Sequence, residues 1–214
     1  MGAKRKEEGT TYYYIYNHTI VNRVKEKTLY SMSRELAKGP NTGSTIHEEE
    51  FSSLTGFMKS IRAKESTNSE YGKQWEVILE DEEGETSTLQ FAYSFLYARN
   101  FIKSLVNIDP KKQVEIGCYG AKDTFEGKEK TNTKLYLKQD GEFVKMKFTK
   151  ANPEGCPEPL DSSDNNGKPI KVYANVMQFL EAHIVENIDP YLRGADARVS
   201  SEEVDAEEND DMPF

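Results

Sequence analysis

Gln74-Trp75-Glu76-Val77-Ile78-Leu79-Glu80 is a short run rich in apolar residues, and Asp81-Glu82-Glu83-Gly84 follows it directly. An acidic tetrapeptide that ends in glycine is typical of a turn between strands. Beyond the turn, the segment from Thr86 to Tyr93 alternates between polar and apolar residues, as a half-buried strand does. Another strand candidate, Leu54 to Lys64, precedes this region. We therefore predict three consecutive strands.

The hydrophobic pattern changes its period after these strands. Phe95, Arg99, Ile102 and Val106 recur at helical spacing, which predicts an amphipathic helix. Asp109-Pro110 should end it. Strand patterns return from Gln113 to Tyr119 and twice more between Asn132 and Phe148. Three strands, a helix and then two or more strands is the order of an OB-fold, a five-stranded Greek-key β-barrel. We therefore expect a mainly β protein of this class.

The flanking regions suggest additions to such a barrel. Residues 12–16 and 19–21 are β-prone, and Asn17-His18 could form a hairpin turn between them, although a longer loop is an equal alternative. A last helix is predicted from Val172 to Ile188. The expected organisation is an N-terminal extension over 1–53 with a hairpin packing on the barrel, an OB core over 54–150, a loop and helix over 151–194, and a disordered acidic tail over 195–214.

The bulk composition limits the class of protein. Hydrophobic residues make up 36% of the 214 residues and charged residues 30%, which suits a soluble body with a β-rich core. No apolar run approaches the roughly 20 residues that cross a bilayer. Residues 1–8 also lack the apolar segment of a signal peptide. We expect an intracellular, cytoplasmic location and no membrane partner.

Cysteine and histidine usage points away from metal chemistry. The two cysteines, Cys118 and Cys156, share no ligand spacing, and the three histidines are scattered. We expect no metal ion and no other cofactor. The net charge of −9 is concentrated at one end, because residues 200–214 hold seven acids and no base. The remaining 28 basic and 30 acidic side chains (37 minus 7) nearly balance.

Asp140-Gly141 is a strong signal for a two-residue hairpin turn. A turn at this position pairs Lys138 with Phe143, Leu137 with Val144, and Tyr136 with Lys145. One face of the hairpin then consists of Leu135, Leu137, Val144, Met146 and Phe148. The opposite face consists of Lys134, Tyr136, Lys138, Phe143, Lys145 and Lys147.

The second face suits unpaired nucleic acid. Aromatic rings stack on bases of any sequence, and lysines neutralise phosphates. We therefore predict that this face binds single-stranded nucleic acid. The alternative is an ordinary solvated lysine face whose two aromatic residues pack across the strands.

A second group of basic and aromatic residues surrounds the loop between the first two barrel strands. Its members are Lys59, Arg62, Lys64, Tyr71, Lys73 and Trp75. Trp75 shares its side of the strand with Val77 and Leu79, so a core position competes with a stacking role. The N-terminal tyrosines cannot all be core residues of one strand; two should face outward.

The segment Glu207-Glu208-Asn209-Asp210-Asp211-Met212-Pro213-Phe214 combines acids with an apolar tip. Its acids favour an unfolded chain, and the tip offers a ring and a carboxylate to a basic-rimmed pocket. The predicted partner-docking residues are Asp210, Asp211, Met212, Pro213 and Phe214. A generic solubilising tail is the alternative, and the segment could also compete with DNA for the protein's own basic groove.

This tip resembles that of bacterial and phage single-stranded DNA-binding proteins, with Met212 in place of the usual isoleucine. The segment from Gly56 to Ala63, followed by Trp75 to Asp81, looks like OB domains of replication protein A and phage single-strand binders. The resemblance implies sequence-independent binding during DNA replication, recombination or repair. It also implies recruitment of a polymerase, helicase, primase or nuclease, and it leaves room for a homo-oligomer. The short tether before the acids is more similar to phage members.

Three other classes of protein are alternatives. An OB-type RNA-binding protein would use the same stacking chemistry, and a tail-mediated interaction module would need only the acidic tip. A nuclease is the enzymatic alternative. The carboxylates of residues 80–83 fall on a predicted turn, and no nucleophile pair or phosphate-binding loop accompanies them. We therefore expect no catalytic activity.

Overall fold

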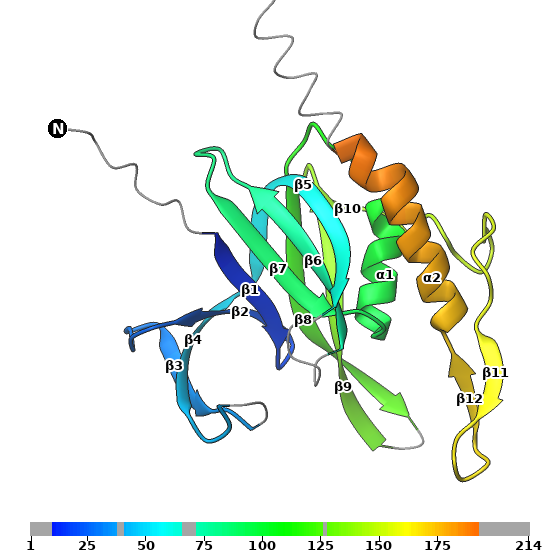
Figure 1. The fold of residues 1–214 in the computed structure, drawn as a ribbon, viewed down its shortest axis with the longest axis horizontal. Helices are drawn as coiled ribbons and strands as arrows, with labels where there is room; N and C mark the ends of the chain where they lie inside the picture. Colours follow the sequence, from blue (N-terminus) through cyan, green and yellow to red (C-terminus); the bar gives the residue numbers. More distant parts are fainter. Residues whose placement is uncertain (1–9, 38–40, 66–71, 126–127, 193–214) are drawn as a thin grey trace, which may run out of the picture.

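The computed structural model describes residues 10–37, 41–65, 72–125 and 128–192, which fold mainly into β-strands (Figure 1). The strands are β1 (Thr11–Tyr16), β2 (Thr19–Val24), β3 (Ser31–Glu35), β4 (Thr45–Phe51), β5 (Ser53–Glu65), β6 (Lys73–Glu80), β7 (Thr86–Ala92), β8 (Val114–Phe125), β9 (Lys128–Gln139), β10 (Glu142–Phe143), β11 (Leu160–Ser163) and β12 (Pro169–Val172). The helices are α1 (Leu96–Leu105), α2 (Ala174–His183) and the π-helical turn η1 (Ile184–Ile188).

Ten strands form one mixed sheet in the order β10-β9-β8-β5-β6-β7-β1-β2-β4-β3. Neighbours are antiparallel except β1 and β7, which are parallel. The long strand β5 is shared between two partners, since Ser53–Gly56 pairs with β8 and Phe57–Glu65 pairs with β6. An irregularity between Met58 and Ser60 accompanies this change of partner, and such bulges bend a strand.

The N-terminal residues belong to the same sheet. Asn17 and His18 have positive φ angles of 45° and 68°, the geometry of a two-residue hairpin turn, and β1 and β2 pair on either side of it. The His18 ring reaches the far end of the sheet, where Nδ1 lies 2.8 Å from Thr133 Oγ1 on β9. The hairpin therefore bridges the edge of β7 and the β8–β9 ribbon.

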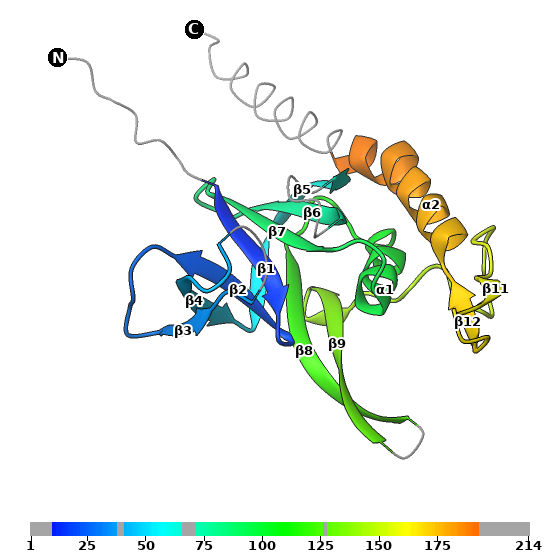
Figure 2. The ribbon, with the colours of Figure 1, turned by 60° about the horizontal axis from the view of Figure 1, so that its bottom comes forward.

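Both helices lie on one side of the sheet, as Figures 1 and 2 show. α1 is the predicted helix, but its buried face is different. It buries Tyr97, Phe101, Ile102 and Leu105, so only Ile102 of the predicted face is in the core, and Phe95, just before the helix, is 58% exposed. α2 runs beside α1 and begins later than expected, because Pro169–Val172 is used for strand β12. The β11–β12 hairpin occupies a region where the sequence predicts only a loop and the start of a helix.

Candidate nucleic-acid interface

Strands β8 and β9 form a long antiparallel ribbon that extends beyond the rest of the sheet (Figures 1 and 2). Ile116 and Cys118 of β8 and Leu135 and Leu137 of β9 are buried in the core. Because side chains alternate along a strand, the residues between them face outward. Register pairs on this outward side are Glu115–Lys138, Gly117–Tyr136 and Tyr119–Lys134.

Three aromatic rings follow one another across this outward side. The Tyr119 and Tyr136 ring centroids are 6.1 Å apart, and those of Tyr136 and Phe143 are 5.7 Å apart. Phe143 is 64% exposed and Tyr119 is 50% exposed, so both rings present free surface. We call Tyr119, Lys134, Tyr136, Lys138 and Phe143 the aromatic strip.

Gly117 makes the central position of the strip possible. A Cβ atom at residue 117 would lie 2.0 Å from Tyr136 Cζ, which is far too close for two non-bonded atoms. The Tyr136 ring therefore lies across the β8 backbone at Gly117, where no side chain stands. Its hydroxyl donates a 2.9 Å hydrogen bond to Glu115 Oε1. Burial, assisted by this carboxylate, raises the pKa of Tyr136 to about 12, so the hydroxyl stays protonated at neutral pH.

Charge and aromatic surface are combined in the strip. Lys138 Nζ lies 5.1 Å from the ring centroids of both Tyr136 and Phe143, within the range of a cation–π contact. It is also 3.8 Å from Glu115 Oε1. Lys134 stands opposite Tyr119. The arrangement offers rings for stacking on bases and ammonium groups for phosphates.

The predicted hairpin register is present at its start and ends early. Glu142 pairs with Gln139 and Phe143 with Lys138, and the Val144 N–H donates to the Leu137 carbonyl oxygen. The strand then stops, because the chain turns toward α1, where the Lys147 N–H donates to the Lys103 carbonyl oxygen. The predicted pairing of Tyr136 with Lys145 is therefore wrong.

The two C-terminal lysines of the predicted face leave it for the same reason. The carbonyl oxygen of Lys145 accepts a hydrogen bond from Asn107 Nδ2, just beyond α1. Lys147 Nζ is 3.3 Å from a carboxylate oxygen of Glu154. Lys145 and Lys147 therefore do not belong to the aromatic strip.

The second predicted group does not form one surface. Arg62 and Lys64 lie on the outer face of β5, where both approach Glu76. Lys59, at the irregular part of β5, is 3.1 Å from Glu80 Oε1. Tyr71 lies outside the described residues. A bulge separates Lys59 from Arg62. Lys73 and Trp75, the remaining two members of the group, lie on the opposite side of the sheet from Arg62.

Trp75 is a core residue, and its assignment as a DNA-stacking residue is wrong. Its side chain is fully buried, and its Nε1 donates a 3.1 Å hydrogen bond to the Tyr93 carbonyl oxygen. The Tyr93 ring stacks on it at a centroid distance of 5.4 Å. Trp75 is on the same side of the strand as Val77 and Leu79, and this alternation pattern correctly predicts that it is buried.

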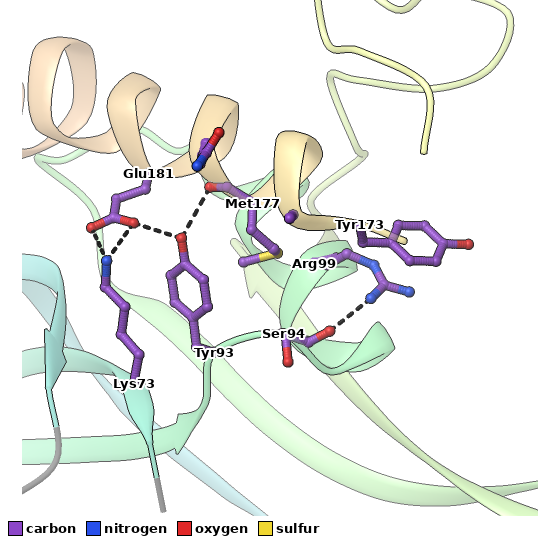
Figure 3. A pocket seen from close by; sticks show the side chains of 9 residues that line it. Lys73, Tyr93, Ser94, Arg99, Tyr173, Met177 and Glu181 are labelled. Carbon is purple, nitrogen blue, oxygen red and sulfur yellow. Dashed lines mark hydrogen bonds and ion pairs between the residues drawn. The ribbon is translucent and has the colours of Figure 1, made fainter. Parts of the chain in front are cut away.

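Lys73 lines a separate pocket of about 520 Å³ between the sheet and the two helices (Figure 3). Its Nζ donates to both carboxylate oxygens of Glu181 at 2.6 and 2.7 Å, and the Tyr93 hydroxyl donates to the same group at 2.5 Å. On the other side of the pocket, the Arg99 guanidinium lies 3.6 Å from the Tyr173 ring centroid. Lys73 is thus part of the contact that joins α2 to the sheet.

Tyr119 is the strip residue that the sequence prediction missed. The alternation of Val114, Ile116 and Cys118 along β8 carries the signal, since it places Tyr119 on the outward side. The predicted docking residues Asp210, Asp211, Met212, Pro213 and Phe214 lie outside the described residues.

No protein-family model, curated protein or solved structure matches this chain. Within the described residues, no group of three or more His, Cys, Asp or Glu side chains could hold a metal ion. None of the helices in those residues is long and apolar enough to cross a membrane.

Proposed function

We propose that the protein binds single-stranded DNA without sequence preference and protects it during replication, recombination or repair. The observation that carries the proposal is the aromatic strip, in which three rings, two of them exposed, lie beside Lys134 and Lys138 on an extended ribbon. Stacking on such rings contributes about 1–3 kcal/mol per base. Base-edge readers are not needed for this mode, and the proposal therefore concerns unpaired strands of any sequence.

We further propose that β5 to β9 form an OB-type barrel. Three features support this: the strand order β9-β8-β5-β6-β7, the position of α1 between β7 and β8, and the sharing of β5 between two partners. OB-folds use the loop between their fourth and fifth strands for oligonucleotide binding. In this assignment, β8 and β9 are the fourth and fifth strands, and the strip lies on them at the end of the ribbon next to the β9–β10 turn.

The acidic segment completes the proposal. We assign the recruitment of replication or repair enzymes to Asp210–Phe214, by the chemistry of an apolar ring among acids. Deleting these five residues should abolish recruitment and leave DNA affinity equal or higher, because acids near a basic surface oppose DNA. A marked loss of DNA affinity in the deletion variant would contradict this part.

The first test is fluorescence anisotropy with labelled oligo-dT, a duplex of equal length and a matched RNA, across a salt series. We expect tight binding to oligo-dT that weakens with salt, and weak binding to the duplex. Equal affinity for the RNA would favour an RNA-binding protein. No preference for single strands would overturn the proposal. A protein-interaction module built on the acidic segment would then be the better account.

A further inference from the structure

The tyrosines of β1 project to both sides of the sheet, three of them to the side away from the core. Tyr13 packs edge-on against Phe51 at a centroid distance of 5.2 Å. Tyr12, Tyr14 and Tyr16 share the opposite side, where Tyr12 is 56% and Tyr16 is 43% exposed. This side belongs to the N-terminal extension, and it lies several strands along the sheet from the aromatic strip.

A buried carboxylate organises the part of this side nearest β3. Glu48 of β4 is 3% exposed. It accepts hydrogen bonds from Arg34 Nε and Nη2, each at 2.7 Å, and from the Tyr14 hydroxyl. Because Tyr14 lies two strands from β4 in the sheet order, these contacts require the outer side of β1, β2, β4 and β3 to be concave.

The same contacts place a guanidinium on an aromatic ring. The Arg34 guanidinium carbon is 3.8 Å from the Tyr16 ring centroid, and its two bonds to Glu48 hold its plane in position. Guanidinium planes and aromatic rings are the two groups on which proteins stack unpaired bases. The Tyr16–Arg34 pair is therefore a preformed stacking surface.

A second buried carboxylate repeats the pattern on the neighbouring strands. Glu76 of β6 is 4% exposed, and it accepts hydrogen bonds from Arg62 Nε at 2.6 Å and Gln90 Nε2 at 3.1 Å. Gln90 stands beside Tyr14 in the parallel pairing of β7 and β1. Both carboxylates are paired with arginines. The exposed groups on this side include the Tyr16 ring and the Arg62 guanidinium, together with Lys64 and Glu50.

Arg23 lies on the same side, opposite Glu48 in the register, with its guanidinium carbon 5.9 Å from the Tyr14 ring centroid. We propose that this tyrosine face, made of Tyr12, Tyr16, Arg23, Arg34 and Arg62, is a second binding surface for unpaired nucleotides. This proposal rests on the proposed function and extends it. A DNA strand bound to the aromatic strip reaches the tyrosine face only if the DNA is long enough. The His18–Thr133 contact fixes the β1–β2 hairpin to the β8–β9 ribbon, so the two surfaces keep a constant separation.

The test compares oligo-dT of about 6 nucleotides, near the lower limit for one OB surface, with oligo-dT of about 30 nucleotides. Four full-length variants are measured beside the unaltered chain. Tyr12→Ala with Tyr16→Ala removes the exposed rings, and Phe143→Ala impairs the aromatic strip. Tyr191→Ala removes an equally exposed ring at the end of the last helix and serves as the matched control. Arg23→Gln is a milder second variant of the tyrosine face.

We expect the double tyrosine variant to bind the short oligonucleotide as the unaltered chain does and to lose at least about fivefold in affinity for the long one, as expected for one lost stacking contact. Phe143→Ala should weaken binding of both lengths. Unchanged affinity for the long oligonucleotide in the double variant would overturn the second surface and leave the proposed function intact. Weaker binding of the short one would also overturn it as a separate surface. Failure of the unaltered chain to bind either length would overturn both proposals.

Discussion

Tyr136 holds its position because residue 117 has no side chain. In Gly117→Ala, the new methyl group would occupy the space of the Tyr136 ring and displace it from β8. We expect weaker binding of oligo-dT, by roughly tenfold, since one stacking contact is worth about 1–3 kcal/mol. The fold should lose about 1–3 kcal/mol of stability from overpacking. Anisotropy and thermal melting measure the two effects.

A double-mutant cycle separates this effect from a general loss of structure. In a Tyr136→Ala background, the space above residue 117 is empty. Adding Gly117→Ala should then change DNA affinity no further. An equal loss of affinity in both backgrounds would mean that Gly117 acts through the β8 backbone and not through the Tyr136 ring.

Phe143 is the most exposed ring of the strip and the easiest to remove without harm to the core. We expect Phe143→Ala to weaken oligo-dT binding by about 5- to 150-fold, the equivalent of one lost stacked base. Its melting temperature should stay close to that of the unaltered protein. Tyr191→Ala, as in the length experiment, should leave affinity unchanged, and a loss of similar size there would contradict a specific strip.

Among single side chains, alternation alone predicts much of the candidate site. It places Tyr136, Lys138 and Lys134 on the outer side and Trp75 with the core. It cannot predict the partners of a charged residue: Arg62 and Lys73, which the sequence analysis places in one basic group, bind carboxylates on opposite sides of the sheet.

Among the elements, local turn chemistry predicts where the hairpins begin and long-range contacts decide where they end. Asp140 and Gly141 both have positive φ, as the turn requires. The end of β10 depends on a hydrogen bond between Lys147 and Lys103 of α1, and nothing in the hairpin sequence itself encodes that partner.

The docking of α2 on the sheet should depend on pH. Burial opposes ionisation of Glu181, but hydrogen bonds from Lys73 and Tyr93 outweigh it, so the pKa of this carboxyl lies below its ordinary value of 4.5. A lowered carboxyl pKa stabilises the fold above the unfolded value, and the contribution is lost as pH falls through the folded value.

Glu181→Gln removes this titration. We expect the variant to melt below the unaltered protein at pH 7, and the difference in Tm to shrink as the pH falls below about 4.5. Thermal unfolding followed by circular dichroism from pH 7 to pH 3 gives the comparison. A difference that stays constant over this range would show that the Glu181 charge does not join α2 to the sheet.

For the molecule as a whole, the order of strands and helices predicts a mainly β protein, and the structure confirms this fold class. The sequence does not predict the single ten-stranded sheet. β1 joins β7 in parallel, although more than 60 residues separate Tyr16 from Thr86, and such distant pairings leave no periodic signal.

Charge distribution leads to a further prediction for the molecule. A net charge of −9 means that DNA binding must depend on local lysines. Each phosphate contact on a single strand contributes about 0.7 to the slope of log affinity against log salt concentration. We expect Lys134→Gln to reduce the slope by about that amount, and Lys138→Gln by less because Glu115 is nearby. Lys171→Gln, on β12, should leave the slope unchanged, and a change there would mean that binding follows overall charge.

The most direct test of the aromatic strip is photocrosslinking to oligonucleotides that carry 5-bromodeoxyuridine, with the modified residues located by mass spectrometry. Halogenated bases react preferentially with the rings on which they stack. We predict adducts on Tyr119, Tyr136 or Phe143, and their loss when unlabelled oligo-dT competes. Efficient crosslinking that reaches none of these three rings would contradict the central claim.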